Sequence, residues 1–600
     1  MPEATTPATI LRGMPAAPGI AIGPVWHYRH GPARGEPLPN VRAAADQASS
    51  ELLALAERVR GLGRRDEAEI FDAQALMAVD PMLLEEVDAR AAAIGSADPD
   101  ALAAAVEAVA RAAAETLAAL PDETLAARAA DVRDVGGRIA RIVAGREIDL
   151  PDRPSIALAD DLPPSVTAEL PPGLLLGIAL EGGSPLSHAA ILARGLGIPA
   201  VVAVPGLVAS AEAAGAAAVA GKDGGAGGAG GAAAVMVGLD GEAGTLILDP
   251  SADAVAALEA RRAERSRQGE AARALRGRPG QTADGVAVRL LANIGRPEDA
   301  ARALEAGAEG VGLFRTEFLF VGRSDAPSED EQTAAYAAVI RAFGPARPVV
   351  IRLADIGGDK GIPYLHLAAE DNPFLGVRGL RLGYDDRSLI RTQVRAIARA
   401  GADAGAMPHL MAPMVSTFED VTMLREIVAD ALASLDAEGT ARAGRLIVGI
   451  MVEVPSAALC APELATEVDF FSIGSNDLTQ YVLAMDRTNA RLATAADALH
   501  PAVLRAIRAT VEGAATRGIP VAVCGELAAD PLGAAVLVGL GVDDLSMDAG
   551  ALDEVRLMLS QVTSGALREL ATSALGARTA GEVRAVAAAI VDQTQSAAGT

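Results

Sequence analysis

From residue 284 onward the sequence alternates short apolar runs with amphipathic stretches, and this alternation constrains the fold more than any other feature. Helical patterns such as 297–308 and 502–517 separate the runs. Eight runs are typical of strands: 286–294, 310–315, 349–354, 410–415, 446–454, 470–474, 521–524 and 544–547. Eight strand–helix units predict a (β/α)8 barrel, whose active site lies at the carboxyl ends of its strands.

Polar residues end two of these runs. In Asp469-Phe-Phe-Ser-Ile-Gly-Ser-Asn-Asp-Leu-Thr-Gln480 the apolar run stops at Gly474 and is followed by Asn476 and Asp477. Glu453 lies near the end of the run 446–454. Two strand-end acids and an amide suit a hard divalent cation such as Mg²⁺, which prefers oxygen ligands. The simpler alternative is that both acids cap the helices that follow.

Further strand ends carry charged or reactive side chains. The polar residues expected at the barrel mouth are Asn293, Arg315, Glu317, Arg352, Asp355, Glu453, Asn476, Asp477, Cys524 and Glu526. Arginine holds phosphate or carboxylate through two hydrogen bonds, and the acids suit a metal ion. The set predicts a site for a small phosphorylated carboxylic acid.

A second candidate centre is His188, in Gly182-Gly-Ser-Pro-Leu-Ser-His-Ala-Ala-Ile-Leu-Ala-Arg194. A glycine-rich turn leads into an apolar helix with the histidine in or near its first turn, and a helix start favours anions. A lone histidine in such a place is more often structural. However, no histidine of the barrel falls in a strand-end cluster of acids, so a nucleophile from another domain is a reasonable hypothesis.

The first half of the chain has three patterns. Residues 8–30 indicate short strands, residues 40–148 acidic helices, and residues 153–250 alternating strands and helices with a Gly/Ala tract at 221–234 that suggests a surface loop. Residues 251–275 predict a helix of roughly 37 Å, long enough to separate two domains.

Composition excludes several classes of protein. The net charge of −26 disfavours nucleic acid and anionic membranes but allows a basic protein partner. The two cysteines, Cys460 and Cys524, argue against a disulfide framework. No run reaches the ~18 apolar residues of a membrane span, and no signal-peptide pattern opens the chain. We therefore expect a cytoplasmic location.

Several long motifs occur in order along nearly the whole chain. They are His188-Ala-Ala-Ile-Leu-Ala-Arg194, Gly312-Leu-Phe-Arg-Thr-Glu-Phe-Leu-Phe320, Asp355-Ile-Gly-Gly-Asp-Lys360, Asn372-Pro-Phe-Leu-Gly-Val-Arg378, Met451-Val-Glu-Val-Pro455, Ser472-Ile-Gly-Ser-Asn-Asp-Leu-Thr-Gln480 and Cys524-Gly-Glu-Leu527. In these motifs the sequence closely resembles Enzyme I of the bacterial phosphotransferase system, the phosphoenolpyruvate–protein phosphotransferases.

The resemblance implies a multidomain α/β protein. Residues 1–34 and 149–250 would form a swivelling phosphohistidine α/β domain, and the inserted residues 35–148 a helical domain that binds the phosphocarrier protein HPr. Residues 251–280 would form a linker helix. Residues 281–600 would form the phosphoenolpyruvate-binding (β/α)8 barrel, through which members of this family dimerise.

The resemblance also implies the reaction and its residues. His188 would take the phosphoryl group of phosphoenolpyruvate and pass it to a histidine of HPr, the first step of sugar uptake by this system. Cys524 would protonate the enolpyruvate carbon, and Glu453 and Asp477 would bind Mg²⁺. The remaining motif positions would hold substrate or phosphohistidine: Arg315, Arg352, Asn476, Asp477, Arg487, Lys360 and Arg378 for the substrate, and Thr167 for the phosphohistidine.

The sequence departs from the family near the histidine, where Leu186 replaces a common threonine. Three alternatives stay open. A dikinase would need an ATP-binding domain, for which too few residues precede His188 and no phosphate-binding glycine loop is present. A catalytically silent regulatory paralogue would not need the complete set of Arg, Glu, Asp and Cys. A stand-alone barrel lyase acting on pyruvate enolates would leave the first 280 residues without a role.

Overall fold

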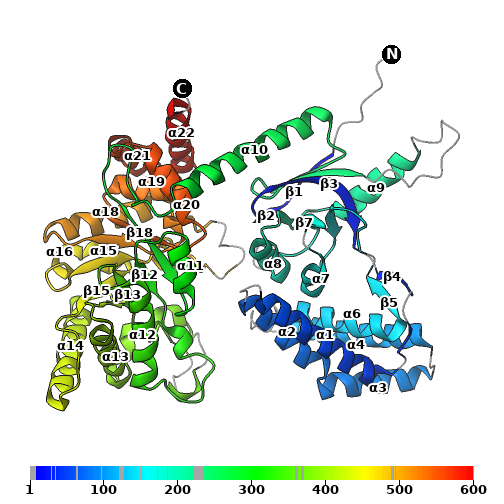
Figure 1. Ribbon diagram of the computed structural model, residues 1–600, viewed down its shortest axis with the longest axis horizontal. Coiled ribbons are helices and arrows are strands. Elements are labelled where there is room, and N and C mark those ends of the chain that lie inside the picture. Colours follow the sequence, from blue (N-terminus) through cyan, green and yellow to red (C-terminus); the bar gives the residue numbers. More distant parts are fainter. Residues whose placement is uncertain are drawn as a thin grey trace. The chain divides into compact units, whose positions relative to one another are not determined.

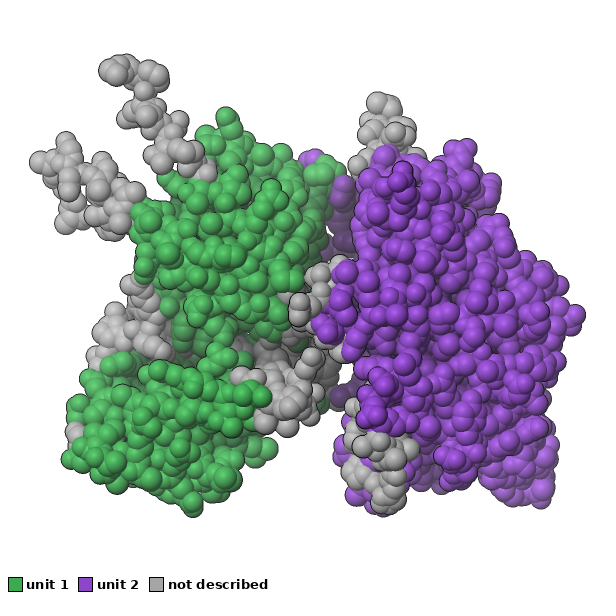
Figure 2. All heavy atoms as spheres, turned by 180° about the vertical axis from the view of Figure 1, so that it is seen from behind, with its two compact units in different colours: residues 1–266 green, residues 267–600 purple. Residues whose placement is uncertain are grey.

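The computed structural model describes residues 9–598 apart from short internal stretches, and it separates them into two compact units, residues 1–266 and 267–600 (Figure 2). The stretches outside the description are 29, 34–35, 39, 62–64, 96–97, 120–127, 149, 172, 185–186, 221–234, 358–361, 366–369, 488, 490–491 and 493–494. Lys360, Leu186 and the Gly/Ala tract 221–234 therefore lie outside the described residues.

An eight-stranded mixed sheet forms one part of the first unit (Figure 1). The strand order is β1-β10-β9-β3-β6-β7-β8-β2; neighbours from β3 to β8 are parallel and the remaining pairs antiparallel. The strands are β1 (Thr9–Arg12), β2 (Met14–Ala17), β3 (Ile20–His27), β6 (Ser155–Ala159), β7 (Leu175–Leu180), β8 (Ala200–Val202), β9 (Met236–Asp240) and β10 (Thr245–Leu248).

Helices cover both faces of this sheet because successive side chains of a strand point to opposite sides. In β6, Ala157 and Ala159 pack in one cluster with α7 (Pro164–Glu169) and α8 (His188–Leu196). Ile156 and Leu158 pack in another cluster with α9 (Leu207–Ala220).

A helical bundle forms the other part of the first unit and has its own apolar core, rich in alanine, valine and leucine. Its helices are α1 (Val41–Gly61), α2 (Arg65–Ala78), α3 (Pro81–Ile94), α4 (Pro99–Ala118) and α6 (Ala129–Ala144). Asp80 and Asp98 cap α3 and α4 by accepting backbone N–H groups, and each is followed by proline, which suits a first helical position. The chain enters and leaves the bundle through the antiparallel pair β4 (His30–Ala33) and β5 (Arg146–Ile148).

Helix α10 (Ala252–Ala274) follows the last strand of the first unit, and the boundary between the two units falls within it. It lies inside the segment 251–280 for which a linker helix is expected. The exact domain boundaries stay a prediction.

The second unit is a closed barrel of eight parallel strands. They are β11 (Arg289–Ile294), β12 (Val311–Phe314), β13 (Val349–Arg352), β14 (His409–Ala412), β15 (Ile447–Val452), β16 (Phe470–Ile473), β17 (Val521–Val523) and β18 (Asp544–Met547). Each predicted run contains or overlaps one of these strands, and β11 pairs with β18 to close the barrel. The prediction of a multidomain α/β protein with a (β/α)8 barrel is confirmed.

Helices surround the barrel, and within the described residues none is long and apolar enough to cross a membrane. The α-helices are α11 (Asp299–Glu305), α12 (Glu329–Phe343), α13 (Ser388–Ala404), α14 (Phe418–Glu438), α15 (Pro455–Leu459), α16 (Ala461–Leu464), α17 (Ser475–Leu483), α18 (Pro501–Ala515), α19 (Pro531–Leu540), α20 (Leu552–Gln561), α21 (Ser564–Gly576) and α22 (Ala580–Ala598). Short 3₁₀ turns are η1 (Glu317–Leu319), η2 (Pro363–Leu365), η3 (Pro373–Leu375), η4 (Gly379–Tyr384) and η5 (Glu526–Ala528).

Candidate active site

The carboxyl ends of the barrel strands carry most of the residues that the sequence singles out. Arg352 is the last residue of β13, Glu453 directly follows β15, and Cys524 directly follows β17. Asn476 and Asp477 lie in the first turn of α17, just after β16. Since all eight strands are parallel, these positions share one rim of the barrel.

Four charged side chains form a continuous network at this rim. Glu317 Oε1 accepts hydrogen bonds from Arg352 Nη2 (2.9 Å) and from the backbone N–H of Asp355 (2.7 Å). Asp355 accepts two hydrogen bonds from Arg378, at 3.1 and 2.9 Å, and lies 3.6 Å from Arg352 Nη1. Arg352 and Arg378 are buried. The network fixes both guanidinium groups before any substrate arrives.

A chain of buried hydrogen bonds holds the backbone of Arg352 in place. Thr316 Oγ1 donates to the carbonyl of Arg352 (2.8 Å), and Gln393 Nε2 donates to Thr316 Oγ1 (2.9 Å) and to the Tyr336 hydroxyl (3.0 Å). Gln393 also accepts from the N–H of Ala354 (3.0 Å). This chain ties the end of β13 to α12 and α13.

Glu453 and Asp477 form a carboxylate pair. Glu453 is 1% exposed; its Oε1 accepts from the N–H of Met414 (2.6 Å), but its buried Oε2 has no hydrogen-bond partner in the described part of the chain. Burial, together with the carboxylates of Asp355 and Asp477, raises the pKa of Glu453 to about 8. Gly474 leaves room for this side chain, because a Cβ there would lie 2.9 Å from Oε2. Glu453 therefore combines an unsatisfied buried oxygen with a carboxyl group that favours its protonated form when no cation is bound.

Cys524 is held inside the barrel rim. Its backbone carbonyl accepts a hydrogen bond from Asn293 Nδ2 (3.0 Å), and Ser546 Oγ donates to Asn293 Oδ1 (2.6 Å). Burial raises the pKa of the Cys524 thiol. At neutral pH this thiol keeps its proton and can donate it.

The remaining predicted substrate residues differ in exposure. Asn476 exchanges two hydrogen bonds with Glu526, through its Nδ2 (3.2 Å) and its Oδ1 (2.9 Å). Arg487 is exposed, with Nη1 3.5 Å from Asp477 Oδ2. Arg315, just after β12, is also exposed.

His188 is the first residue of α8 in the first unit. The Ser187 side chain caps this helix by accepting from the N–H of Ala190 (3.4 Å). Thr167 lies in α7, which packs against α8, and its hydroxyl donates to the carbonyl of Pro163 (3.4 Å). The start of α8 therefore offers backbone N–H groups beside His188.

A cavity of about 430 Å³ adjoins this helix start. It is lined by Gly182, Gly183 and Ser187 from the sheet part, and by arginines of α6 from the helical part. The arginines are Arg133, Arg138 and Arg141. Asp134, Asp160 and Asp161 line the same cavity, so side chains of both charges lie beside the beginning of α8.

Three family models match consecutive parts of the chain. Residues 12–128 match the N-terminal domain of PEP-utilising enzymes, 151–224 their mobile domain, and 269–564 their PEP-binding domain. The first two matches fall in the first unit, and the third covers the barrel.

Curated relatives match over long ranges. The phosphoenolpyruvate-protein phosphotransferase of Streptomyces coelicolor is 40% identical over 97% of this chain and 99% of its own length. The chain belongs to the phosphoenolpyruvate–protein phosphotransferase family. The protein of that name from Priestia megaterium is 35% identical over 92% of this chain and 94% of its own. A multiphosphoryl transfer protein of Xanthomonas campestris is 46% identical over 73% of this chain, and the match spans about half of that relative (49%).

The sequence motifs of this family identified the residues at the barrel rim. They did not identify the side chains that hold those residues in place. Glu317 and Asp355 were expected at the rim among acids that suit a metal ion, and the structure makes them the hydrogen-bond partners of Arg352 and Arg378. Gln393 was not singled out, since a glutamine within a helix carries no local signal. The arginines of α6 were also missed; their three-to-five-residue spacing along one helix was the available signal.

Proposed function

We propose that this chain transfers the phosphoryl group of phosphoenolpyruvate to Nε2 of His188 and then to a histidine of the small phosphocarrier protein HPr, releasing pyruvate. The observation that carries this proposal is the barrel rim, where fixed arginines, a buried carboxyl with an unsatisfied oxygen and a protonated thiol occur together. The arginines can bind the anionic substrate, the carboxyl group can bind a metal ion, and the thiol can protonate the carbon of enolpyruvate.

The arginines would hold the substrate. Phosphoenolpyruvate carries a phosphate and a carboxylate, and each can accept two hydrogen bonds from one guanidinium. Arg352 is already oriented by Glu317, and Arg378 by Asp355. The exposed Arg315 and Arg487, the amide of Asn476 and the backbone of Asp477 would complete the site, with Lys360 as a further phosphate contact.

Glu453 and Asp477 would hold Mg²⁺. Within the described ranges no cluster of three or more His, Cys, Asp or Glu side chains is arranged as a metal site. Mg²⁺ commonly needs only one or two protein carboxylates, with substrate and water as its other ligands. The buried Oε2 of Glu453 fits such a ligand, since it has no hydrogen-bond partner among the residues that the structure describes. The ion, when bound, supplies positive charge against the negative charge of the transferring group.

The residues of the proposed site account for each bond that forms or breaks in this reaction and for the proton that moves. The unprotonated Nε2 of His188 forms a bond to phosphorus as the bond from phosphorus to the enolpyruvate oxygen breaks. The Cys524 thiol gives its proton to the terminal carbon, which yields pyruvate, and the thiolate recovers a proton from solvent. Phosphoryl transfer of this kind depends chiefly on positioning and charge stabilisation.

The start of α8 would stabilise the phosphohistidine. Its backbone N–H groups and the positive end of the helix dipole favour an anion at this place. Thr167 would contact the phosphoryl group. The helical segment 35–148 would then dock HPr, and the barrel would form a homodimer, as the resemblance to Enzyme I implies.

Carrier dependence tests the proposed function. Purified chain with phosphoenolpyruvate, Mg²⁺ and HPr should release pyruvate repeatedly without any nucleotide, measured by a coupled lactate dehydrogenase assay. Without HPr, pyruvate should stop at about one molecule per active chain. Turnover that required AMP, ATP or inorganic phosphate would instead indicate a dikinase, and the absence of pyruvate in every mixture would indicate a silent paralogue.

Replacing Glu453 by glutamine should weaken the Mg²⁺ dependence of phosphorylation. In the wild type, Mg²⁺ should raise the thermal unfolding midpoint, and Glu453→Gln should lose most of that rise. Glu438→Gln, which removes a charge that pairs with Arg395 on an outer helix, is the matched control and should retain it. An unchanged Mg²⁺ response in Glu453→Gln would refute this ligand.

The same variant gives a pH prediction in EDTA. The folded pKa of Glu453, about 8, lies above its unfolded value of 4.5, so the folded state holds the extra proton between these values. Stability therefore falls as pH rises from about 5 to 8. Glu453→Gln should lack this term and gain about 2 to 4 kcal/mol relative to the wild type across that window. Urea unfolding at several pH values measures the difference; parallel wild-type and variant curves would contradict it.

A further inference from the structure

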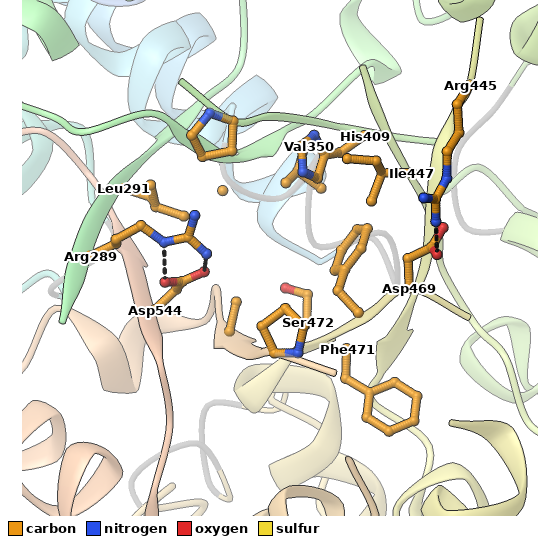
Figure 3. A pocket seen from close by; sticks show the side chains of 15 residues that line it. Arg289, Leu291, Val350, His409, Arg445, Ile447, Asp469, Phe471, Ser472 and Asp544 are labelled. Carbon is orange, nitrogen blue, oxygen red and sulfur yellow. Dashed lines mark hydrogen bonds and ion pairs between the residues drawn. The ribbon is translucent and has the colours of Figure 1, made fainter. Parts of the chain in front are cut away.

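A cavity of about 360 Å³ lies inside the barrel at the end where the strands begin (Figure 3). Its lining includes the first residues of five strands: Arg289 of β11, His409 of β14, Ile447 of β15, Phe470 of β16 and Asp544 of β18. The proposed catalytic residues follow the other ends of the strands. This cavity is therefore separate from the rim that would bind phosphoenolpyruvate.

Small residues leave this space open. Branched side chains usually fill the interior layers of such barrels, but Gly312 and Ala522 line the cavity here. Gly449 makes room for Phe470, because a Cβ at that glycine would lie 2.4 Å from the Phe470 ring. The opening therefore results from specific residues of the sequence.

Two ion pairs stand on opposite sides of the cavity in Figure 3. Arg289 donates from Nε and Nη2 to the two oxygens of Asp544, both at 2.6 Å. Arg445 donates from Nη2 to Asp469. Two arginines and two aspartates sum to no net charge. A polyanion would face two carboxylates, whereas a molecule with one positive and one negative group meets an opposite charge on each side.

The surface between the ion pairs is mostly apolar and includes one polar ring. Leu291, Val350 and Ile447 supply aliphatic contacts. Nδ1 of His409 is buried and has no hydrogen-bond partner among the described residues. Burial lowers the pKa of His409 to about 4, so the ring is neutral at pH 7. It adds a hydrogen-bonding group to the cavity without adding charge.

We propose that this cavity binds a small zwitterionic amino acid with an apolar side chain. The aliphatic residues would contact that side chain. Arg445, which uses only Nη2 on Asp469, would take the ligand carboxylate, and Asp544 would accept the ammonium group with the lone pairs that Arg289 leaves. The volume corresponds to about twelve waters at ~30 Å³ each, and it lies at the lower end of ligand pockets. That size accommodates an amino acid.

Calorimetric titration of the full chain with L-leucine tests the proposal. We expect one molecule bound per chain, with an affinity that saturating phosphoenolpyruvate leaves unchanged. Two analogues that each lack one charge are the matched probes: 4-methylpentanoate without the ammonium group, and 3-methylbutylamine without the carboxylate. Each should bind at least tenfold more weakly than leucine.

Variants localise the binding. Ala522→Leu fills the cavity and should abolish the leucine signal. Arg445→Gln changes an exposed side chain at the edge of the cavity, where folding is not at risk, and should weaken binding at least tenfold. Arg391→Gln, an exposed arginine paired with Asp430 on the outer helices, is the control and should bind as the wild type does.

Several outcomes would contradict the proposed amino-acid site. No heat of binding for leucine in the wild type overturns the site. Binding that survives both Ala522→Leu and Arg445→Gln, or that phosphoenolpyruvate displaces, assigns leucine elsewhere. Binding of 4-methylpentanoate as tightly as leucine overturns the zwitterionic ligand class. None of these results bears on phosphorylation of His188, which is tested separately.

Discussion

His188→Ala is expected to abolish phosphorylation of the chain by phosphoenolpyruvate. The wild type, incubated with ³²P-labelled phosphoenolpyruvate and Mg²⁺, should acquire an acid-labile, base-stable label, as expected for phosphohistidine. The variant lacks the atom that receives the phosphoryl group, and loss of a covalent nucleophile typically costs on the order of 10⁶-fold in rate. Gel autoradiography and intact-mass measurement check this result. A label that persisted in His188→Ala would refute the nucleophile.

Two controls separate this loss from general damage. His500 caps α18 through Nδ1, so His500→Asn retains a capping acceptor and should be labelled like the wild type. The barrel of His188→Ala should still bind phosphoenolpyruvate, because the proposed substrate residues belong to the other unit. Loss of substrate binding in calorimetry would show that the variant is defective in more than its nucleophile.

Arg352→Lys is expected to lower kcat/KM for phosphoenolpyruvate by roughly 10²- to 10³-fold, the usual effect of removing one charge-stabilising donor. Lysine keeps the charge beside Glu317 but loses the planar fork that holds phosphate or carboxylate through two bonds. Steady-state pyruvate release in the presence of HPr measures the effect.

The half-reactions show whether the loss belongs to the barrel. Phosphorylated HPr should label His188 of Arg352→Lys at the wild-type rate, because that step does not use phosphoenolpyruvate. Arg395→Lys is the matched substitution, since Arg395 is also buried and pairs with Glu329 and Glu438 outside the site. Equal loss in both half-reactions, or equal loss in Arg395→Lys, would contradict a substrate role for Arg352.

The barrel could be predicted because its signal is local. Each strand is a short apolar run ending in polar residues, as in the run 470–474 before Asn476 and Asp477. Parallel strands bring such ends to one rim whatever their distance along the chain. The position of Glu453 near Asp477 therefore followed from periodicity and the closing rule of the barrel.

The supporting contacts could not be predicted in the same way. Gln393 supports Arg352 through Thr316 from a helix far along the chain, and a buried glutamine has no distinctive spacing. Asn293 supports Cys524 across the barrel seam. Such partners depend on side-chain packing in three dimensions.

The sequence by itself determined the class of fold, the strand ends and the residue types for phosphoryl chemistry, because apolar runs and helical patterns depend only on residues that are close together in the chain. The tertiary structure alone decided which charges are buried, paired or left unsatisfied. Glu453 is an ordinary glutamate in the sequence, and its raised pKa arises from burial and from two carboxylates, Asp355 after β13 and Asp477 in α17. The cavity at the opposite end of the barrel likewise exists only because residues from different strands leave the same space open.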